Sequence, residues 1–452
     1  MGNDRRRERV TGVILALLVV LSLVLSFGLW WSAAGPLTGE ELWRQEPPSP
    51  PPTPEWYLVV KPTRLLVHLE GDRRAMFLPA SAGYRDLWEA GCASGVGLAG
   101  LGPPARDPLR ESEARALEEG AFLDARFPAP LPGQVVARAY GLRGDLPELV
   151  EGLVVAPAQW PYVAVRYGGR LYPLEGAAGR DYRMLDQLLS GLGTPEAVAG
   201  AGGVPAVSPT LPEGWEAAPD LWVPKMAAVP RLTTGFVPPP GYGQTLVGQF
   251  FADPGVVRRI EERDGATIFT DGRSGLRVYP SGALEYNTPP PTGTRGSIEP
   301  DAALSVALSF LAGHGGIPPG TVLWGYRSAR LEEERSWALG MGLLANGLVA
   351  VAPGGAVSLA VGEQGLYEYR AAAWTPWRES SGSQRIMSAQ EALARLAARH
   401  RGGARVLDVY PAYTAHPAVA GELRPAWIVR TENDQWAVDA VTGQVQSFGG
   451  RW

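Results

Sequence analysis

Residues whose types and spacing would support chemistry are few in this sequence. Residues 95–100 read GVGLAG, which matches the G-x-G-x-x-G pattern of dinucleotide-binding loops. That fingerprint needs a strand before it and a helix opening from it. Here a helical pattern precedes the stretch, and Pro103-Pro104 follows it. The context therefore favours a flexible loop, and the sequence predicts no cofactor.

The histidines give no local pattern of metal ligands. They are His68, His314, His400 and His416, and no two of them lie three or four residues apart, as a helical metal site needs. His68 falls in a strand pattern, whereas His314 and His400 fall near predicted helix ends. The sequence therefore predicts no metal site, and a site assembled from distant histidines stays open as an alternative.

The motifs of common exported hydrolases are also missing. None of S-x-x-K, G-x-S-x-G and H-E-x-x-H occurs in the chain. Glu332-Glu333-Glu334 is more typical of a solvated turn than of paired catalytic carboxylates. We therefore expect no catalytic residues and no enzyme. A catalytic centre assembled from distant residues stays open as an alternative, because triads are spatial arrangements.

Aromatic side chains crowd the C-terminal half. Two interpretations stay open for them, since aromatic residues fill thin β-rich cores and are also enriched in the cores of protein interfaces. The residues concerned are Trp324, Tyr326, Trp337, Tyr367, Tyr369, Trp374, Trp377, Tyr410, Tyr413, Trp427 and Trp436.

Strand patterns alternate with scattered helices, which predicts an α+β fold. Residues 56–60 and 65–69 read as strands, and Gly168-Gly169 predicts a hairpin turn. Residues 197–207 are rich in Ala and Gly and predict a flexible loop.

In the second half of the chain, a helix followed by several strands occurs twice. The helices are predicted at 301–311 and 389–399, and the second begins with a capping box from Ser388 to Glu391. Strands are expected at 322–330, 336–344, 348–351, 356–361 and 366–369 after the first helix, and at 405–413, 426–430, 435–439 and 445–448 after the second. We infer two related units, each a helix plus an antiparallel sheet.

The N-terminus predicts a membrane anchor. Four arginines within residues 5–9 precede an uncharged apolar run over residues 10–31, and the next positive charge is Arg44. A helix of that length is about 33 Å long, and a bilayer core is about 30 Å thick. The positive flank places residues 1–9 in the cytoplasm and the bulk of the chain outside the cell. A signal peptide cleaved near Ser32-Ala33-Ala34 is the competing interpretation.

Composition and breaks in pattern suggest the remaining organisation. We expect a Pro-rich linker at 32–54 and three folded domains at 55–244, 245–372 and 373–452. The single cysteine, Cys92, excludes an intramolecular disulfide. The net charge of −5 offers no basis for binding nucleic acid.

Several segments resemble the YycH family of single-pass membrane proteins. Beyond the basic head and apolar span, the similar stretches are FFADPGVVRRI at 250–260, TIFTDG at 267–272, LRV at 276–278, FLAGHGG at 310–316, YPAY at 410–413 and PAWIV at 425–429. The resemblance extends along the chain and is weak at each residue. These segments are typical of a fold and carry no catalytic residues.

The resemblance implies an accessory regulator of a two-component system in a Gram-positive bacterium. YycH relatives associate with a YycI-like membrane protein and a YycG/WalK-type sensor histidine kinase, and they tune cell-wall homeostasis. Small residues allow close packing between membrane helices, so Gly12, Ala16, Ser22 and Ser26 are candidate contacts, although their occurrence can also be incidental. The alternative function is an exported cell-envelope enzyme or ligand-binding protein with a dispersed site.

Overall fold

The chain divides into two units, Met1–Pro51 and Pro52–Trp452, and the fold described here is that of the second. The computed structural model describes residues 56–71, 73–93, 98–157, 162–234, 238–289, 296–331, 334–351, 356–372, 377–400, 402–415 and 423–450. Within these ranges no helix is long and apolar enough to cross a bilayer. The predicted membrane helix at 10–31, with Gly12, Ala16, Ser22 and Ser26, lies outside the described residues.

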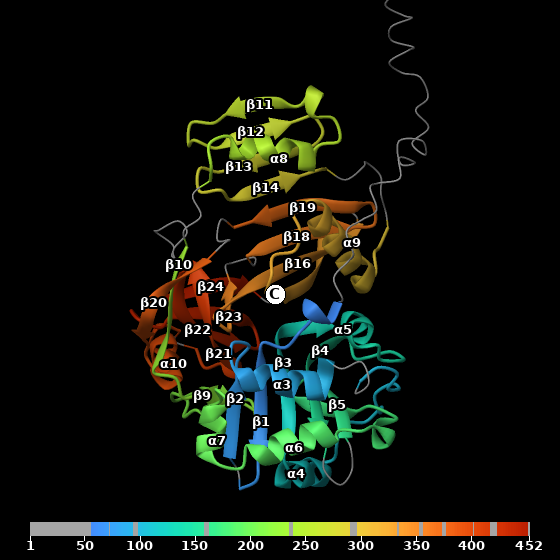
Figure 1. Cartoon of the computed structure of the whole chain (residues 1–452), viewed down its shortest axis with the longest axis vertical. Helices are drawn as coiled ribbons and strands as arrows, with labels where there is room; N and C mark the ends of the chain where they lie inside the picture. Colours follow the sequence, from blue (N-terminus) through green and yellow to red (C-terminus); the bar gives the residue numbers. More distant parts are fainter. Residues whose placement is uncertain are drawn as a thin grey trace, which may run out of the picture. The chain divides into compact units, whose positions relative to one another are not determined.

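The first half of this unit is built on an eight-stranded antiparallel sheet (Figure 1). The strand order is β6-β5-β4-β3-β1-β2-β7-β9. The strands are β1 (Arg64–Leu69), β2 (Arg73–Phe77), β3 (Phe122–Pro132), β4 (Leu149–Ala156), β5 (Tyr162–Tyr167), β6 (Arg170–Pro173), β7 (Val204–Val207) and β9 (Val223–Pro224).

Helices cover the apolar face of this sheet. Side chains alternate between the two faces of a strand, so Val67 and Leu123 pack toward α3, α5 and α6 in one core. The opposite face carries charged residues, among them Arg64, Asp124 and Arg166. The helices of this half are α3 (Ala82–Trp88), α4 (Glu111–Glu119), α5 (Gly133–Tyr140), α6 (Arg183–Gly191) and α7 (Pro195–Gly200), with a π-helical turn at Glu89–Ala93.

The second half forms a fourteen-stranded sheet. Its main path is β11-β12-β13-β14-β19-β18-β16-β17-β21-β22-β23-β24, with β15 added on β16 and β8 on β21. The strands are β8 (Glu216–Ala217), β11 (Arg258–Glu261), β12 (Thr267–Thr270), β13 (Gly275–Val278), β14 (Leu284–Asn287), β15 (Thr321–Leu331), β16 (Glu334–Ala345), β17 (Leu348–Val351), β18 (Val357–Gly362), β19 (Gly365–Ala371), β21 (Arg405–Ala415), β22 (Leu423–Thr431), β23 (Asp434–Asp439) and β24 (Val445–Gly450).

Three helices pack on this large sheet. They are α8 (Tyr242–Phe250), α9 (Pro300–Gly313) and α10 (Ala389–Arg399). The start of α10 is fixed by its capping box, because the Ser388 hydroxyl accepts from the Glu391 N–H and the Glu391 carboxylate accepts from the Ser388 N–H. A separate two-stranded sheet pairs β10 (Ala228–Thr234) with β20 (Trp377–Arg385).

Most expected elements are confirmed, and the mixture of helices and large sheets makes the fold α+β. Gly168 and Gly169 both have positive φ, at 57° and 71°, as the predicted hairpin turn between β5 and β6 requires. The helices expected at 301–311 and 389–399 are α9 and α10, and each precedes the predicted strands. The sheet is continuous across the predicted domain ranges 245–372 and 373–452 through the parallel pair β17–β21; the domain boundaries stay predictions.

Two local predictions are wrong. Residues 56–60 form no strand, since a short 3-10 helix occupies Trp56–Leu58. The loop expected at 197–207 overlaps helix α7 and strand β7. Thr194 caps α7 by accepting from the Ala197 N–H, and β7 is held by pairing with β2. That partner is distant in sequence, so composition alone did not indicate it.

Candidate functional site

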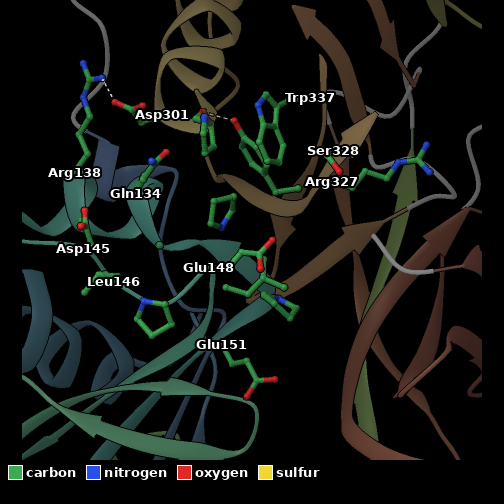
Figure 2. A pocket seen from close by; sticks show the side chains of 18 of the residues that line it. Gln134, Arg138, Asp145, Leu146, Glu148, Glu151, Asp301, Arg327, Ser328 and Trp337 are labelled. Carbon is green, nitrogen blue, oxygen red and sulfur yellow. Dashed lines mark hydrogen bonds and ion pairs between the residues drawn. The ribbon is translucent and has the colours of Figure 1, made fainter. Parts of the chain in front are cut away.

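A cleft of about 1010 Å³ lies between the α5–β4 region and strands of the large sheet (Figure 2). Apolar groups such as Leu146, Leu149 and Trp337 line it, and its charged lining is mainly acidic. The three arginines are Arg138, Arg327 and Arg430. The seven carboxylates are Asp145, Glu148, Glu151, Glu299, Asp301, Glu432 and Asp434.

The first wall of the cleft is α5 and the segment that follows it. Helix α5 buries Val135, Val136 and Tyr140 and ends at Gly141, whose φ of 65° is a left-handed helix cap. The Gly133 N–H donates to the Glu148 carbonyl at 3.1 Å. A Cβ on residue 133 would lie 2.2 Å from the carbonyl oxygen of Pro147, so only glycine allows this approach.

The opposite wall is the start of α9 together with β15 and β16. Trp337 donates its indole N–H to the carbonyl of Ile298 at 2.7 Å, and the Tyr326 hydroxyl donates to the carbonyl of Pro300. These two bonds attach the first turn of α9 to the strands beneath it. Figure 2 shows Trp337 and Ser328 on this side of the cleft and Glu148 and Glu151 on the other.

Two polar contacts link the walls. Arg138 forms an ion pair with Asp301 at 2.9 Å, and Gln134 donates to Glu299 at 3.2 Å. The Arg138 side chain is 51% exposed, and exposed pairs contribute little stability. These two exposed polar contacts are therefore ones that an incoming ligand can replace.

Two other acids in the cleft have no such partners among the described residues. Asp145 and Glu148 are both exposed, and neither forms an ion pair with any residue that the structure describes. They follow α5 on the segment that Gly133 holds in place. The cleft thus combines apolar surface with two available carboxylates, a combination that suits a segment carrying both apolar and cationic side chains.

Arg430, which lines the cleft, lies next to the buried ion pair between Arg64 and Asp408. Its guanidinium lies 3.9 Å from Glu151 and 4.0 Å from Asp408. Asp408 on β21 accepts two bonds of 2.6 Å from Arg64 on β1. Arg64 also donates to the carbonyl of Phe127 and lies 4.2 Å over the ring of Tyr410. This pair joins the first sheet to the large one.

Arginines form a row across the charged face of the first sheet. The register pairs Arg64 with Arg126 and then Gly152 with Arg166 on the next strands. Asp124 is fully buried and accepts from both Arg126 and Arg166, at 2.8 and 2.9 Å. Because residue 152 has no side chain, it adds no bulk to the row between Arg126 and Arg166.

A loop carboxylate completes the neutralisation of this row. Asp220, between β8 and β9, pairs with Arg126 at 2.9 Å and Arg166 at 2.7 Å. Burial alone would raise the pKa of Asp220, but the two guanidinium groups outweigh it and lower the pKa to about 2. The pKa of Asp124 is lowered by the same balance. The low pKa values of Asp124 and Asp220 are therefore explained by their ion pairs with arginines. Structural networks of this kind perturb pKa values as functional sites do, so these shifts alone do not identify a functional site.

His68 lies on the same face of the sheet. Its ring stacks on Phe122 with centroids 3.7 Å apart, and neither ring nitrogen has a hydrogen-bond partner among the described residues. Burial lowers the pKa of His68 to about 3. In the ranges that the structure describes, no group of three or more His, Cys, Asp or Glu side chains could hold a metal ion.

Other residues noted in the sequence have structural roles. His314 and His400 are the C-caps of α9 and α10, as their positions predicted, and His416 lies outside the described residues. A helical turn precedes the GVGLAG stretch, and no helix starts in its described continuation until Glu111. The core-filling interpretation of the aromatic residues is confirmed for the four that are at most 1% exposed: Trp324, Trp427, Tyr410 and Tyr413.

Sequence reasoning missed the buried charges. Asp124 and Asp408 each have apolar residues on both sides in their strands, and Arg64 directly precedes the apolar run Leu65-Leu66-Val67. Charged side chains are rarely buried without a partner. A charge inside or directly beside an apolar run was therefore a signal for a buried ion pair, although its partner could not be read from the sequence.

Comparisons with known proteins give no family. No protein-family model and no curated protein matches this chain. An uncharacterized protein from Eubacterium rectale is 10% identical, with a TM-score of 0.33, over 50% of this chain and 91% of its own. The C-terminal domain of Bacillus megaterium YpeB is 14% identical, with a TM-score of 0.28, over 45% of this chain and 95% of its own. We draw no functional conclusion from similarities this low.

Proposed function

We propose that the chain is a membrane-anchored regulator whose large folded unit lies outside the cell and binds a YycG/WalK-type sensor histidine kinase. The observation that carries the proposal is the arginine cluster followed by the apolar run at residues 10–31. In this proposal residues 10–31 cross the cell membrane once, with the N-terminus in the cytoplasm. A YycI-like membrane protein is the second partner, and the complex adjusts cell-wall homeostasis.

The repeated order of elements supports the family resemblance. Helix α9 precedes β15–β19, and α10 precedes β21–β24. We propose that these are two copies of one helix-plus-sheet unit, as the resemblance to the YycH family implies, since the last two of the three exported domains in that family resemble YycI. This proposal concerns the shared fold and common origin of the two units, and it assigns no catalytic residue.

The acidic cleft is the surface that we assign to the partner. A regulator shifts a kinase only if it binds the two signalling states unequally. Asp145 and Glu148 are exposed carboxylates beside the apolar groups Leu146 and Leu149. Such a surface would hold a cationic, partly apolar segment of a partner in one state and release it in the other.

The same cleft is the basis of the alternative function. A volume of about 1010 Å³ also accommodates a small ligand, as in an exported enzyme or ligand-binding protein. The two functions differ in what occupies the cleft. A kinase that binds there requires the membrane-anchored chain, whereas a small ligand binds the folded unit alone.

Co-purification from membranes tests the proposal. The full chain is expressed with the sensor kinase, extracted in detergent and captured, and the kinase retained is measured. We expect Asp145→Arg with Glu148→Arg, and separately Gly12→Leu with Ala16→Leu, to reduce the retained kinase several-fold.

A matched control separates the cleft from overall charge. Glu196→Arg with Glu213→Arg makes the same change of charge at exposed acids away from the cleft lining. Wild-type chain that retains no kinase would overturn the proposed function. Equal loss in the control pair and the cleft pair would remove the cleft from it.

A further inference from the structure

Strand β11, Arg258–Glu261, forms one edge of the large sheet. All four residues are exposed, and Ile260 is 49% exposed. Among the described strands none pairs with its outer side, and Figure 1 shows β11 as the outermost strand beyond β12. An open edge offers a row of backbone donors and acceptors to another strand.

The hairpin register determines which backbone groups face outward. The Glu262 N–H donates to the carbonyl of Ala266 at 2.8 Å, so this pair is hydrogen-bonded. Hydrogen-bonded and non-hydrogen-bonded pairs alternate along an antiparallel ladder. The β11–β12 register is regular, so Arg258 and Ile260 bond to β12. The N–H and C=O groups of Arg259 and Glu261 then point away from the sheet.

The sequence of this edge is complementary to itself. Residues 258–262 read Arg-Arg-Ile-Glu-Glu, so the charges are opposite on the two sides of Ile260. In an antiparallel pair of two copies centred on Ile260, Arg259 lies opposite Glu261 and Arg258 lies opposite Glu262. Opposite charges directly across a strand pair are stabilising.

Other registers are worse. A shift by one residue would place outward-facing groups opposite inward-facing ones, so the ladder would not form. A shift by two places either Arg259 opposite its own copy or Glu261 opposite its own copy, and like charges directly across are destabilising. The register centred on Ile260 satisfies both the backbone and the charges.

We propose that β11 pairs with β11 of a second copy of this chain, antiparallel about a two-fold axis at Ile260. Within one copy the Glu261 carboxylate pairs with Arg259 at 2.8 Å, and Glu262, one residue beyond the strand, pairs with Arg277 at 2.7 Å. In the dimer the second copy's arginines share these two carboxylates. The exposed Ile260 side chain packs against Ile260 of the second copy and loses its contact with water. An interface of this kind is isologous and closes at two copies.

Cysteine crosslinking tests the register in the full chain. Ile260 faces its own copy in a non-hydrogen-bonded pair, where Cα atoms are about 4.5 Å apart, which suits a disulfide. We expect Ile260→Cys to form a crosslinked dimer at least about tenfold faster than Arg259→Cys or Glu261→Cys.

Those two variants are matched controls, because they would face their own copies only in the shifted registers. Wild-type chain controls for the buried Cys92. Equal crosslinking rates in the three variants, or none with Ile260→Cys, would overturn the proposal.

Charge reversal tests the complementarity independently. Arg259→Glu alone and Glu261→Arg alone each create like-charge pairs across the interface, so we expect the dimer dissociation constant of each to rise at least about tenfold. A mixture of the two variants restores both pairs of opposite charge, and we expect heterodimers to form. Reversed variants that dimerise like wild type, or a mixture that stays monomeric, would contradict the proposed register.

Discussion

Replacing Asp408 by Asn should destabilise the chain far more than loss of an ordinary ion pair. The Arg64 side chain is only 3% exposed, and both of its bonds to Asp408 measure 2.6 Å. Burial would raise the pKa of Asp408, but Arg64 outweighs burial and lowers it, so the carboxylate is charged at neutral pH. The variant leaves the Arg64 guanidinium buried without its counter-charge. We expect a loss of about 3–5 kcal/mol in the free energy of unfolding.

A double variant separates the missing partner from the loss of the pair itself. Replacing both members by apolar residues, as in Arg64→Met with Asp408→Leu, removes the buried charge completely. Such replacements are often neutral or stabilising. We therefore expect the double variant to recover most of the stability that Asp408→Asn loses.

Urea denaturation of the full chain in detergent measures these differences. Tryptophan fluorescence follows unfolding, since Trp324 and Trp427 are fully buried. Asp181→Asn is the matched control, because it removes the carboxylate of a solvent-exposed pair with Arg183. If Asp408→Asn costs no more than Asp181→Asn, or if the double variant is as unstable as the single one, the reasoning about buried charge is refuted.

Three further outcomes are expected. Burial lowers the pKa of His68 to about 3, against about 6.5 when unfolded, so only the unfolded chain takes up this proton as pH falls. This difference in pKa should lower the free energy of unfolding of the wild-type chain by about 2 kcal/mol between pH 7 and pH 5. In urea titrations His68→Phe should remove that decrease, and a variant whose free energy of unfolding falls with pH as steeply as that of wild type would contradict this. Gly133→Ala should cost about 1–3 kcal/mol, because its Cβ would overlap the Pro147 carbonyl, whereas Gly191→Ala, with nothing within 4 Å, should be near neutral in the same titrations. The buried Cys92 thiol, whose pKa is raised by burial, should react with iodoacetamide at least about a hundredfold more slowly in the native than in the unfolded chain, and equal rates would exclude its burial.

Elements with strong local signals were predictable from the sequence. Helix α10 has a capping box at its start and apolar residues on one face, so both its position and its first residue were expected. The β5–β6 turn was marked by Gly168-Gly169. In these cases the determining interactions lie within a few residues of each other.

Elements defined by distant partners were not predictable. Strand β7 is only four residues long and pairs with β2, which lies far earlier in the chain. The cleft brings together Glu148, Asp301 and Arg430 from three separate regions. Periodicity and composition indicate which face of an element is buried, but they do not indicate which other element covers it.

The pairing of Arg64 with Asp408 has a consequence for how the chain matures. The two residues are separated by 344 positions, and synthesis proceeds from the N-terminus. Until the last tenth of the chain has been synthesised, the guanidinium group of Arg64 has no carboxylate from Asp408 and must stay in contact with water. The eight-stranded sheet therefore gains its last ion pair only when nearly the whole protein has been synthesised. We expect incomplete chains to be cleaved by proteases more readily than the finished protein.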